Sequence, residues 1–456
     1  MSAGALPGFR DFYPRDLAER DHVFRAWHDV ARRFAFEAYD GPPLEPLELY
    51  TKKSGEEIVG QLYAFTDKGG REVALRPEMT PSFARMVSAR ANAMRKPVRW
   101  YSIPQLFRYE RQQKGRLREH FQLNVDIVGD AEVTSDAELL AVAIEIMRTC
   151  GLTAEDVVAR ISDRALLVAL LAAWGVPDDA VPVVYSAIDK AEREPRARLV
   201  ERLGAAGVGA DLATHILDTV AASDLVALRA AHGSDPAVAA ALDRLDRYLA
   251  LLGAHGVGTW VRFDLSIVRG LAYYTGIVFE LFDRKGEFRA ICGGGRYDRL
   301  LRDLGGVDLP ALGFGMGDVV LGELLRARGL MTPRPTAADC YIAAEYPVTD
   351  DEVIGIATAL RRVGLAVEYA FSRAPLGRQR KAAWSAQVSY LVEMRRTDDG
   401  LRMHVRDGAG AGLVSAVLNV RTLGDVVGEA ALELDDLLTV IKANPRSIGP
   451  EYRYRA

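Results

Sequence analysis

Basic and polar side chains that could handle a phosphate-bearing substrate crowd into residues 107–126, FRYERQQKGRLREHFQLNVD. Arg108 ends a strand-like run, a polar loop at 111–118 follows, and a second alternating run then returns. The pattern predicts a hairpin, with Gln122 and Asp126 on the polar face of its returning strand. Because arginine presents a rigid fork of donors, this face suits a phosphate. A hairpin whose basic tip is merely solvated is the alternative.

A carboxylate and a hydroxyl lie close together in REVALRPEMTPSFARM, residues 71–86, where an extended run turns into a helix. The two groups are Glu78 and Thr80. Both accept hydrogen bonds, so this position suits a substrate ammonium. The alternative is that Thr80 only caps the helix.

A cation and two phenols adjoin in VRGLAYYTGIVFEL, residues 268–281. Arg269 stands at the start of this stretch, and Tyr273 and Tyr274 lead into a strand-like run. The cation could stabilise charge at a phosphate, and the phenols could contact an aromatic ligand. A tyrosine pair that lines the core beside a surface arginine is the alternative.

Glycines mark two further stretches. In ICGGGRYDRLL, residues 291–301, successive glycines allow the backbone to approach a ligand closely, although a tight turn would need them equally. The stretch ALGFGMGDVVLGELL, residues 311–325, predicts a strand, a turn and a helix. Close packing of that helix start against the strand would also explain its glycines.

Composition limits the class of protein. A chain of 456 residues predicts two or three domains, and a net charge of −4 leaves a nucleic-acid partner only local basic patches. The three cysteines are far apart and form no CxxC pair, so we expect neither structural zinc nor a disulfide framework. The N-terminus has no signal-like apolar region and no run is long enough to span a membrane, which predicts a cytoplasmic protein.

Apolar spacing divides the chain into segments. It predicts a helix over Asp16–Phe36 with Asp16 as its N-cap, then strands at 61–66, 72–76 and 99–107. From Asp136 to about Leu217, and again from Ser223 to Gly253, the pattern is helical. Strand character then resumes, and a Gly- and Pro-containing linker precedes a final strand–helix–strand–helix–strand unit. We therefore expect boundaries that give segments 1–164, 165–255, 256–330 and 338–456.

Taken together and in this order, these motifs resemble the histidyl-tRNA synthetases, a family of class II aminoacyl-tRNA synthetases. Residues 107–126 resemble motif 2, the first helix and the Pro-bounded strand after it resemble motif 1, and 311–325 resembles motif 3. The phrase RPE-x-T and the Arg–Tyr–Tyr element resemble histidine-binding elements of the family. The resemblance implies an α+β catalytic domain, an antiparallel sheet with flanking helices, formed by 1–164 and 256–330. It further implies a helical insertion at 165–255 and a C-terminal α/β anticodon-binding domain at 338–456.

The family resemblance implies that histidine and ATP form histidyl-adenylate, after which the histidyl group passes to histidine tRNA. It implies Mg²⁺ with the ATP, no metal held by the protein itself, and a homodimer formed through motif 1. The implied catalytic cations are Arg108 and Arg269, and the implied histidine-binding residues are Glu78, Thr80, Gln122, Asp126, Tyr273 and Tyr274. Arg108, Glu110, Arg118 and His120 would bind ATP, and Gln113, Arg116, Arg378, Arg380 and Lys381 would bind tRNA.

Departures from the family pattern concern mainly the adenine site. Val320 stands where motif 3 normally has an arginine over the adenine ring, and His120 stands where a phenylalanine normally stacks. A third departure is Ala272, where the usual form has an aspartate. We hypothesise a remodelled adenine pocket in which ATP is still used. The main alternative is a non-catalytic relative such as the regulatory subunit of ATP phosphoribosyltransferase, which has this catalytic fold but generally lacks the C-terminal domain.

Overall fold

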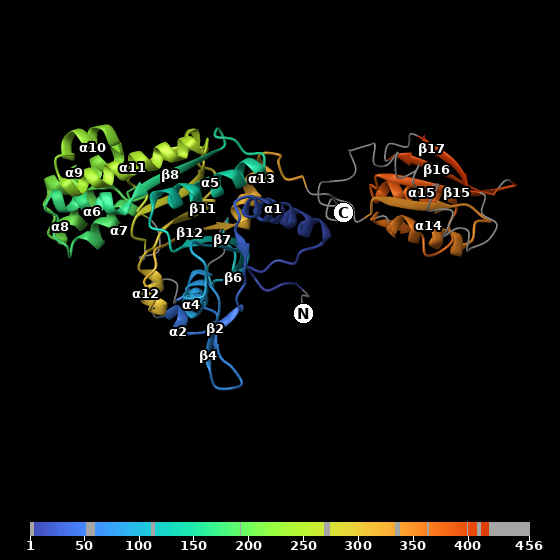
Figure 1. Ribbon diagram of the computed structural model, residues 1–456, viewed down its shortest axis with the longest axis horizontal. Coiled ribbons are helices and arrows are strands. Elements are labelled where there is room, and N and C mark those ends of the chain that lie inside the picture. The colour runs from blue at the N-terminus through green and yellow to red at the C-terminus, as the bar shows by residue number, and fades with distance from the viewer. Residues whose placement is uncertain are drawn as a thin grey trace. The chain divides into compact units, whose positions relative to one another are not determined.

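The computed structural model describes residues 4–51, 60–110, 115–191, 193–268, 274–332, 338–362, 364–398, 400–407 and 412–418. The chain divides into two compact units, Met1–Pro333 and Arg334–Ala456 (Figure 1). Across the described ranges, none of the helices has the length and apolar character needed to cross a membrane.

A nine-stranded mixed sheet forms the centre of the first unit, in the order β1-β5-β7-β12-β11-β10-β8-β9 with β6 also paired to β7. Neighbours are antiparallel except for β1 with β5 and β8 with β9. The strands are β1 (Glu37–Ala38), β5 (Val98–Ser102), β6 (Gln105–Phe107), β7 (Glu119–Val128), β8 (Val157–Asp163), β9 (Val261–Phe263), β10 (Ile277–Asp283), β11 (Cys292–Arg296) and β12 (Ala311–Gly317).

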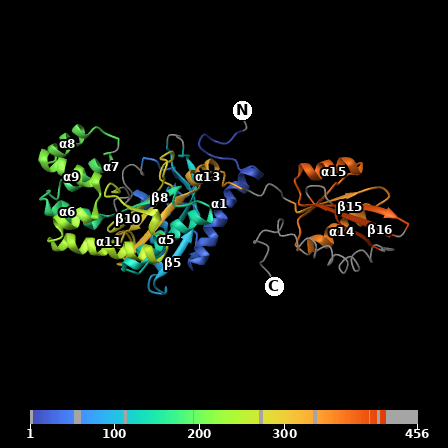
Figure 2. The ribbon, with the colours of Figure 1, turned by 90° about the horizontal axis from the view of Figure 1, so that it is seen from above.

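One face of this sheet is apolar and carries α1 (Pro14–Arg33), α5 (Val133–Thr149) and α13 (Asp318–Ala327) (Figures 1 and 2). Leu123, Val125 and Ile127 of β7 are buried in the core beneath these helices. The predicted alternation of β7 is therefore confirmed, because Gln122, Asn124 and Asp126 occupy the intervening positions and face the other way.

The opposite face holds a smaller layer and the polar side chains. Its elements are α4 (Thr80–Arg90), α12 (Leu300–Gly305), α2 (Glu48–Thr51) and a three-stranded antiparallel sheet of β2 (Leu44–Pro46), β4 (Glu72–Leu75) and β3 (Ala64–Thr66). A second apolar cluster there includes Phe83, Val128 and Tyr297, with Tyr39 and Tyr274 packed against it. Aromatic rings thus pack against the polar face of the large sheet.

Two sequence expectations in this unit were wrong. Asp16 is not the N-cap of the first helix, because α1 begins at Pro14 with Tyr13 as the N-cap and Asp16 lies in the first turn. Residues Val157–Asp163, read as part of a helical stretch, form strand β8 between β10 and β9. Pairing on both edges outweighed the local helical pattern, and β-branched side chains suit such a strand.

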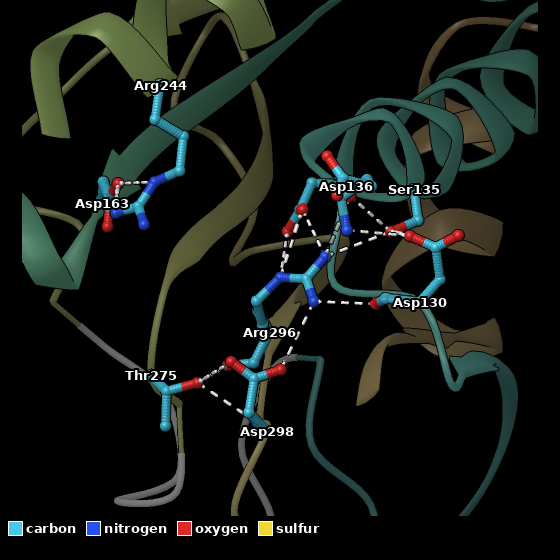
Figure 3. Close-up of polar contacts among 9 residues, drawn as sticks. Asp130, Ser135, Asp136, Asp163, Arg244, Thr275, Arg296 and Asp298 are labelled. Atoms are coloured by element: carbon cyan, nitrogen blue, oxygen red, sulfur yellow. Dashed lines mark hydrogen bonds and ion pairs between the residues drawn. The ribbon is translucent and has the colours of Figure 1, made fainter. Parts of the chain in front are cut away.

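Six helices are described between residues 164 and 254: α6 (Arg164–Ala173), α7 (Val181–Asp189), α8 (Arg196–Ala205), α9 (Ala210–Ala222), α10 (Leu225–His232) and α11 (Pro236–Ala254). Aspartate side chains accept backbone N–H groups at the starts of α6, α10 and α11. The long helix α11 returns against α5, and its Arg244 pairs with the buried Asp163 at the end of β8 (Figure 3). A short 3₁₀ turn, Gly258–Trp260, then leads back into the sheet.

The second unit is a small α/β domain. Its elements are β13 (Cys340–Ala344), α14 (Asp350–Arg362), β14 (Val367–Tyr369), α15 (Leu376–Ser385), β15 (Tyr390–Thr397), β16 (Gly400–Asp407) and β17 (Gly412–Leu418). The first three strands are parallel in the order β14-β13-β15, and β16 and β17 add an antiparallel edge. The predicted strand–helix–strand–helix–strand order is confirmed, whereas β16 and β17 were not foreseen. The predicted fold class, an α+β unit followed by an α/β unit, is confirmed.

Candidate active site

Asp126 lies at the middle of the large sheet, on the polar face of β7. It is only 4% exposed, and the hydroxyl of Tyr297 donates a hydrogen bond to Oδ1 of its carboxylate. Gly313 of β12 lies directly opposite, and a Cβ there would come within 2.1 Å of that same oxygen. Gly313 is therefore needed to leave room for the carboxylate. Burial raises the pKa of Asp126 from 3.8 to about 7, even though the hydrogen bond from Tyr297 lowers it.

Gln122 also depends on a glycine of β12, Gly315, which is two residues beyond Gly313. A Cβ on Gly315 would lie 2.7 Å from the Nε2 atom of Gln122, so this second glycine of β12 clears the space for the amide. The glycines of residues 311–317 thus serve neighbouring polar side chains on β7, rather than only the close helix packing that the sequence left open. Gln122 and Asp126 both stand over the same face of the sheet.

Glu78 and Tyr274 belong to the same region. Glu78 is buried, and the pKa of the Tyr274 phenol is raised first by burial and then by the charges of Cys292, Asp126 and Glu78. Thr80 is the first residue of α4, whose N-cap is Met79 with no side-chain cap, so the capping alternative for Thr80 is wrong. Two carboxylates therefore share an aromatic-lined region in which a cationic amino group and an imidazole could both be read.

Arg296 connects this region to helix α5, as Figure 3 shows. Its guanidinium binds the Asp136 carboxylate, with Nε–Oδ1 at 3.1 Å and Nη2–Oδ2 at 2.5 Å, and also contacts Asp298 at 3.3 Å. Thr275 donates to Asp298 at 3.0 Å, and its backbone N–H donates to the carbonyl of Arg296. Because Tyr297 follows Arg296 directly, this buried network fixes the phenol that binds Asp126.

A hollow of about 190 Å³ adjoins Gln122. Its lining includes Arg108, Glu110, Arg116, His120, Gln122 and Val320, together with backbone at Gly115, Gly293, Gly315 and Gly317. Arg108 donates from Nε to the carbonyl of Pro77 at 2.9 Å, and Arg116 pairs with Glu110 at 2.9 Å. The structure thus brings the motif 2 cation Arg108 next to the polar face that holds Gln122 and Asp126.

Both unusual residues, His120 and Val320, line this hollow. Burial, then the charges of Arg108 and Arg10, lowers the pKa of His120 to about 3, so its imidazole is neutral. Val320 is nearly buried, and a Cβ on Gly115 would lie 3.4 Å from its Cγ2 atom. A nucleotide base in this hollow would contact the neutral imidazole of His120 and the aliphatic side chain of Val320. Neither residue would supply a cation.

Arg10 braces the same wall, and sequence reasoning missed it. It binds Glu119 at 2.6 Å through Nε and Asp318 at 2.8 Å through Nη1. The other oxygen of Asp318 accepts the backbone N–H of Phe121 at 2.9 Å. Glu119 and Phe121 are the neighbours of His120 in the chain, and Asp318 is the first residue of α13, the helix that contains Val320. The guanidinium of Arg10 therefore links the two segments that carry the unusual residues His120 and Val320.

Several predicted site residues lie elsewhere. Arg269, Tyr273 and Gln113 lie outside the described residues. Arg118 stacks over the ring of Tyr109, with its Cζ atom 4.3 Å from the ring centroid, and donates to the carbonyl of Pro7 at 3.4 Å. It is not among the described residues that line the hollow, so its predicted contact with ATP stays a prediction.

On α15 of the second unit, Arg378 and Lys381 are exposed. Arg380 instead donates two hydrogen bonds, of 2.5 and 2.9 Å, to the carboxylate of the buried Glu393. Its guanidinium is therefore already paired within the domain. A separate groove of about 610 Å³ beside α15 was missed; it includes Tyr346 and Phe371, which are 81% and 96% exposed. Isolated aromatic residues carry no such signal in a sequence, because most of them are buried.

Comparisons with known proteins assign the family. Residues 8–317 match the family model of histidyl-tRNA synthetase. The chain is 46% identical over 385 residues to the histidine–tRNA ligase of Opitutus terrae, covering 83% of this chain and 87% of that one. It is 41% identical over 391 residues to the chloroplastic/mitochondrial histidine–tRNA ligase of Arabidopsis thaliana, covering 86% of this chain and 80% of that one.

Solved structures agree on the fold. The histidyl-tRNA synthetase of Nostoc sp. PCC 7120 superposes with a TM-score of 0.78 at 22% identity, covering 95% of this chain and 100% of that one. An ATP phosphoribosyltransferase regulatory subunit/histidyl-tRNA synthetase from Bacillus halodurans C gives a TM-score of 0.69 at 22% identity. Fold, site and relatives together define a class II aminoacyl-tRNA synthetase. The chain belongs to the histidyl-tRNA synthetase family.

Proposed function

We propose that this protein joins histidine to its tRNA in two steps, using ATP. Histidine and ATP first give histidyl-adenylate and pyrophosphate, and the histidyl group then passes to the tRNA. The observation that carries the proposal is that the buried Asp126 carboxylate lies on the same face of β7 as Gln122, which lines a hollow together with Arg108. Relatives named histidine–tRNA ligase, matched over most of their length, support it further. They favour it over the regulatory-subunit alternative.

Histidine would be read mainly by Asp126, which accepts the ring N–H. The Tyr297 hydrogen bond and the Gly313 gap hold that carboxylate in place. An amino acid without the N–H would leave the second oxygen of this buried carboxyl without a donor, since Tyr297 serves only Oδ1, and such a loss is the basis of strong discrimination. Glu78, Thr80 and Gln122 would hold the α-amino group, and Tyr273 and Tyr274 would pack nearby.

ATP would occupy the hollow with its phosphates toward Arg108. As the histidine carboxylate attacks, charge builds on the α-phosphate, and preplaced cations lower that barrier; Arg108 and Arg269 would supply them. Glu110, Arg118 and His120 would contact the nucleotide. Mg²⁺ would bridge the ATP phosphates and be held mainly by the substrate, because this ion keeps several waters and is usually bound through substrate phosphates.

Histidine tRNA would be met in two places. Gln113 and Arg116 of the motif 2 loop would contact its acceptor end, where unpaired bases are open to readout. In the second unit, Arg378 and Lys381 are exposed and would contact the anticodon region directly. Arg380 would contribute there only through charge, because its guanidinium is paired with Glu393. Tyr346 and Phe371 add faces on which bases can stack, and Arg373 lies 6.0 Å from the ring centroid of Tyr346.

Assembly and location complete the proposal. A homodimer through α1 is supported by the resemblance of this helix to motif 1. A cytoplasmic location is supported by three free and buried thiols, which suit a reducing compartment. The segments 1–164, 165–255, 256–330 and 338–456 would act as first catalytic part, insertion, second catalytic part and anticodon-binding domain.

Histidine-dependent exchange of pyrophosphate into ATP tests the first step directly. The purified protein should exchange with histidine alone among the amino acids. Arg108→Ala should reduce the rate by about 100-fold or more, the usual effect of removing a group that stabilises developing charge. Arg326→Ala, at an exposed ion pair with Glu19, is the matched control and should change little. Absence of exchange with every amino acid, from folded protein, would instead favour the regulatory-subunit function.

A further inference from the structure

Residues 274–276 lead directly into strand β10, and the first of them, Tyr274, is a proposed histidine-binding residue. The ring of Tyr274 lies 6.4 Å from that of Tyr297, centroid to centroid, and Tyr297 donates to the carboxylate of Asp126. The path of residues 274–276 therefore decides where the phenol of Tyr274 stands relative to Asp126.

The end of β11 holds one side of this segment. The backbone N–H of Thr275 donates to the carbonyl of Arg296 at 2.7 Å, and its hydroxyl donates to the carboxylate of Asp298 at 3.0 Å. The backbone N–H of Asp298 donates back to the hydroxyl of Thr275 at 3.2 Å. A Cβ on Gly276 would lie 3.2 Å from the Cδ atom of Arg296, so the two chains are in close contact. These contacts all come from the large sheet and the turn that follows it.

The helical insertion holds the other side. Arg164 begins α6, and its backbone N–H donates to the carbonyl of Gly276 at 3.1 Å. Its side chain donates from Nη1 to the carbonyl of Tyr274 at 3.2 Å. The same guanidinium lies over the ring of Tyr185 on α7, with Cζ 4.9 Å from the ring centroid. Burial raises the pKa of the Tyr185 phenol, and the charge and hydrogen bond of Arg164 oppose that rise. One side chain thus contacts both the insertion and the histidine-binding segment.

An arginine side chain has many rotamers, and a contact with an aromatic face restricts them. The ring of Tyr185 therefore helps to aim the guanidinium at the carbonyl of Tyr274. We propose that Arg164 is a positioning residue that links the helical insertion to the histidine pocket through Tyr274. The inference rests on the proposed function. Because coupling between two sites is reciprocal, histidine binding must in turn stabilise the docking of α6 and α7.

Arg164→Met removes the guanidinium but keeps an unbranched chain and the backbone bond to Gly276. Histidine binding, measured by calorimetry without ATP, should weaken about 10-fold, the effect of one lost hydrogen bond from a charged donor. The KM for ATP in pyrophosphate exchange should stay unchanged, whereas a general loss of structure would affect both substrates. Arg196→Met is the matched control, since Arg196 also donates to a backbone carbonyl, that of Thr214 at 3.1 Å, but within the insertion. It should bind histidine like the parent protein.

Tyr185→Leu tests whether the insertion takes part. It should weaken histidine binding about 2- to 5-fold in the parent protein, the usual value of a contact between a cation and an aromatic face. In Arg164→Met it should have no further effect, because the ring acts through the guanidinium. Losses that simply add would overturn the link between the insertion and Tyr274.

Hydrogen exchange measures the reciprocal effect in the parent protein itself. Saturating histidine should slow amide exchange in α7, and this slowing should be lost in Arg164→Met, while α14 of the second unit should be unchanged in both. No slowing in the parent protein, equal slowing in the variant, or normal histidine binding by the variant would each overturn the role of Arg164. Failure of the parent protein to bind histidine at all would overturn the proposed function, on which this role rests.

Discussion

The effect of Asp126→Asn on the free energy of unfolding of the ligand-free protein should depend on pH. It should be more favourable at alkaline pH than at acidic pH. In the folded protein, burial raises the pKa of Asp126 to about 7, against an ordinary value of 3.8. Below 3.8 the carboxyl is protonated in both folded and unfolded chains and has no effect on the pH dependence. Between the two values the unfolded chain releases the proton first, so stability falls as pH rises, and above about 7 the loss levels off.

The size of this effect follows from the two pKa values. The full difference is worth about 4 kcal/mol at about 1.4 kcal/mol per pH unit, of which about 3 kcal/mol develops between pH 5 and pH 8. An asparagine does not titrate, and the cost of its own buried amide is the same at both pH values. The first unit would gain about 2 cal/mol/K of unfolding entropy per residue, so 3 kcal/mol corresponds to roughly 4 °C in Tm.

Scanning calorimetry of the parent protein and Asp126→Asn at both pH values is the assay. The Tm difference between variant and parent should be about 4 °C more favourable to the variant at pH 8 than at pH 5. Asp243→Asn is the control, because Asp243 is an exposed carboxylate paired with Arg229 and should show no such dependence. An equal Tm difference at pH 5 and pH 8 for Asp126→Asn would mean that the buried carboxyl is already ionised at pH 5, and the argument would be refuted.

Three further predictions follow from contacts of single residues. Gly313→Ala should reduce histidine-dependent exchange by about 100-fold or more, because its methyl would overlap the carboxylate oxygen of Asp126. Gly204→Ala on α8 is the control, since a methyl there meets nothing within 4 Å and lies outside the site, and it should leave exchange unchanged. Arg296→Met should lower the Tm by about 4–7 °C, because it leaves the buried Asp136 carboxylate without its partner. Adding Asp136→Leu should restore most of the loss, and a double variant that is equally unstable would exclude this pair as the cause. Phe371→Ala should raise the KM for tRNA in aminoacylation about 5- to 100-fold and leave pyrophosphate exchange unchanged, while an equal loss in both assays would argue against base stacking at this groove.

Much of the fold was predictable because the relevant information is local. The alternation of β7 and the strand–helix order of the second unit depend on residues within one element, and both were read correctly. The strand β8 was missed because its identity comes from pairing with β10 and β9 rather than from its own pattern. The same reason explains β16 and β17, whose partners are each other and β15.

The candidate site shows a similar division. Its charged and polar residues were named from motifs, and Arg108, Gln122, His120 and Val320 do line one hollow. What the sequence could not reveal was the set of groups that hold them. Tyr297 meets Asp126 across 171 residues of chain, and no spacing rule links the two.

The wall of the hollow that holds His120 and Val320 makes this point most clearly. Read singly, Val320 and His120 looked like two losses from a family pattern. In three dimensions Arg10 binds Asp318 and Glu119, which are 308 and 109 residues away from it in the chain, and these carboxylates adjoin both altered positions. A guanidinium is therefore present in this region, although it comes from the N-terminal segment and not from motif 3. Its charge contributes to the low pKa of His120 and so helps to keep that imidazole neutral. If a nucleotide base enters this hollow, a neutral imidazole can stack on it and a valine can make apolar contact with it, so neither position would supply the charge of an arginine over the ring.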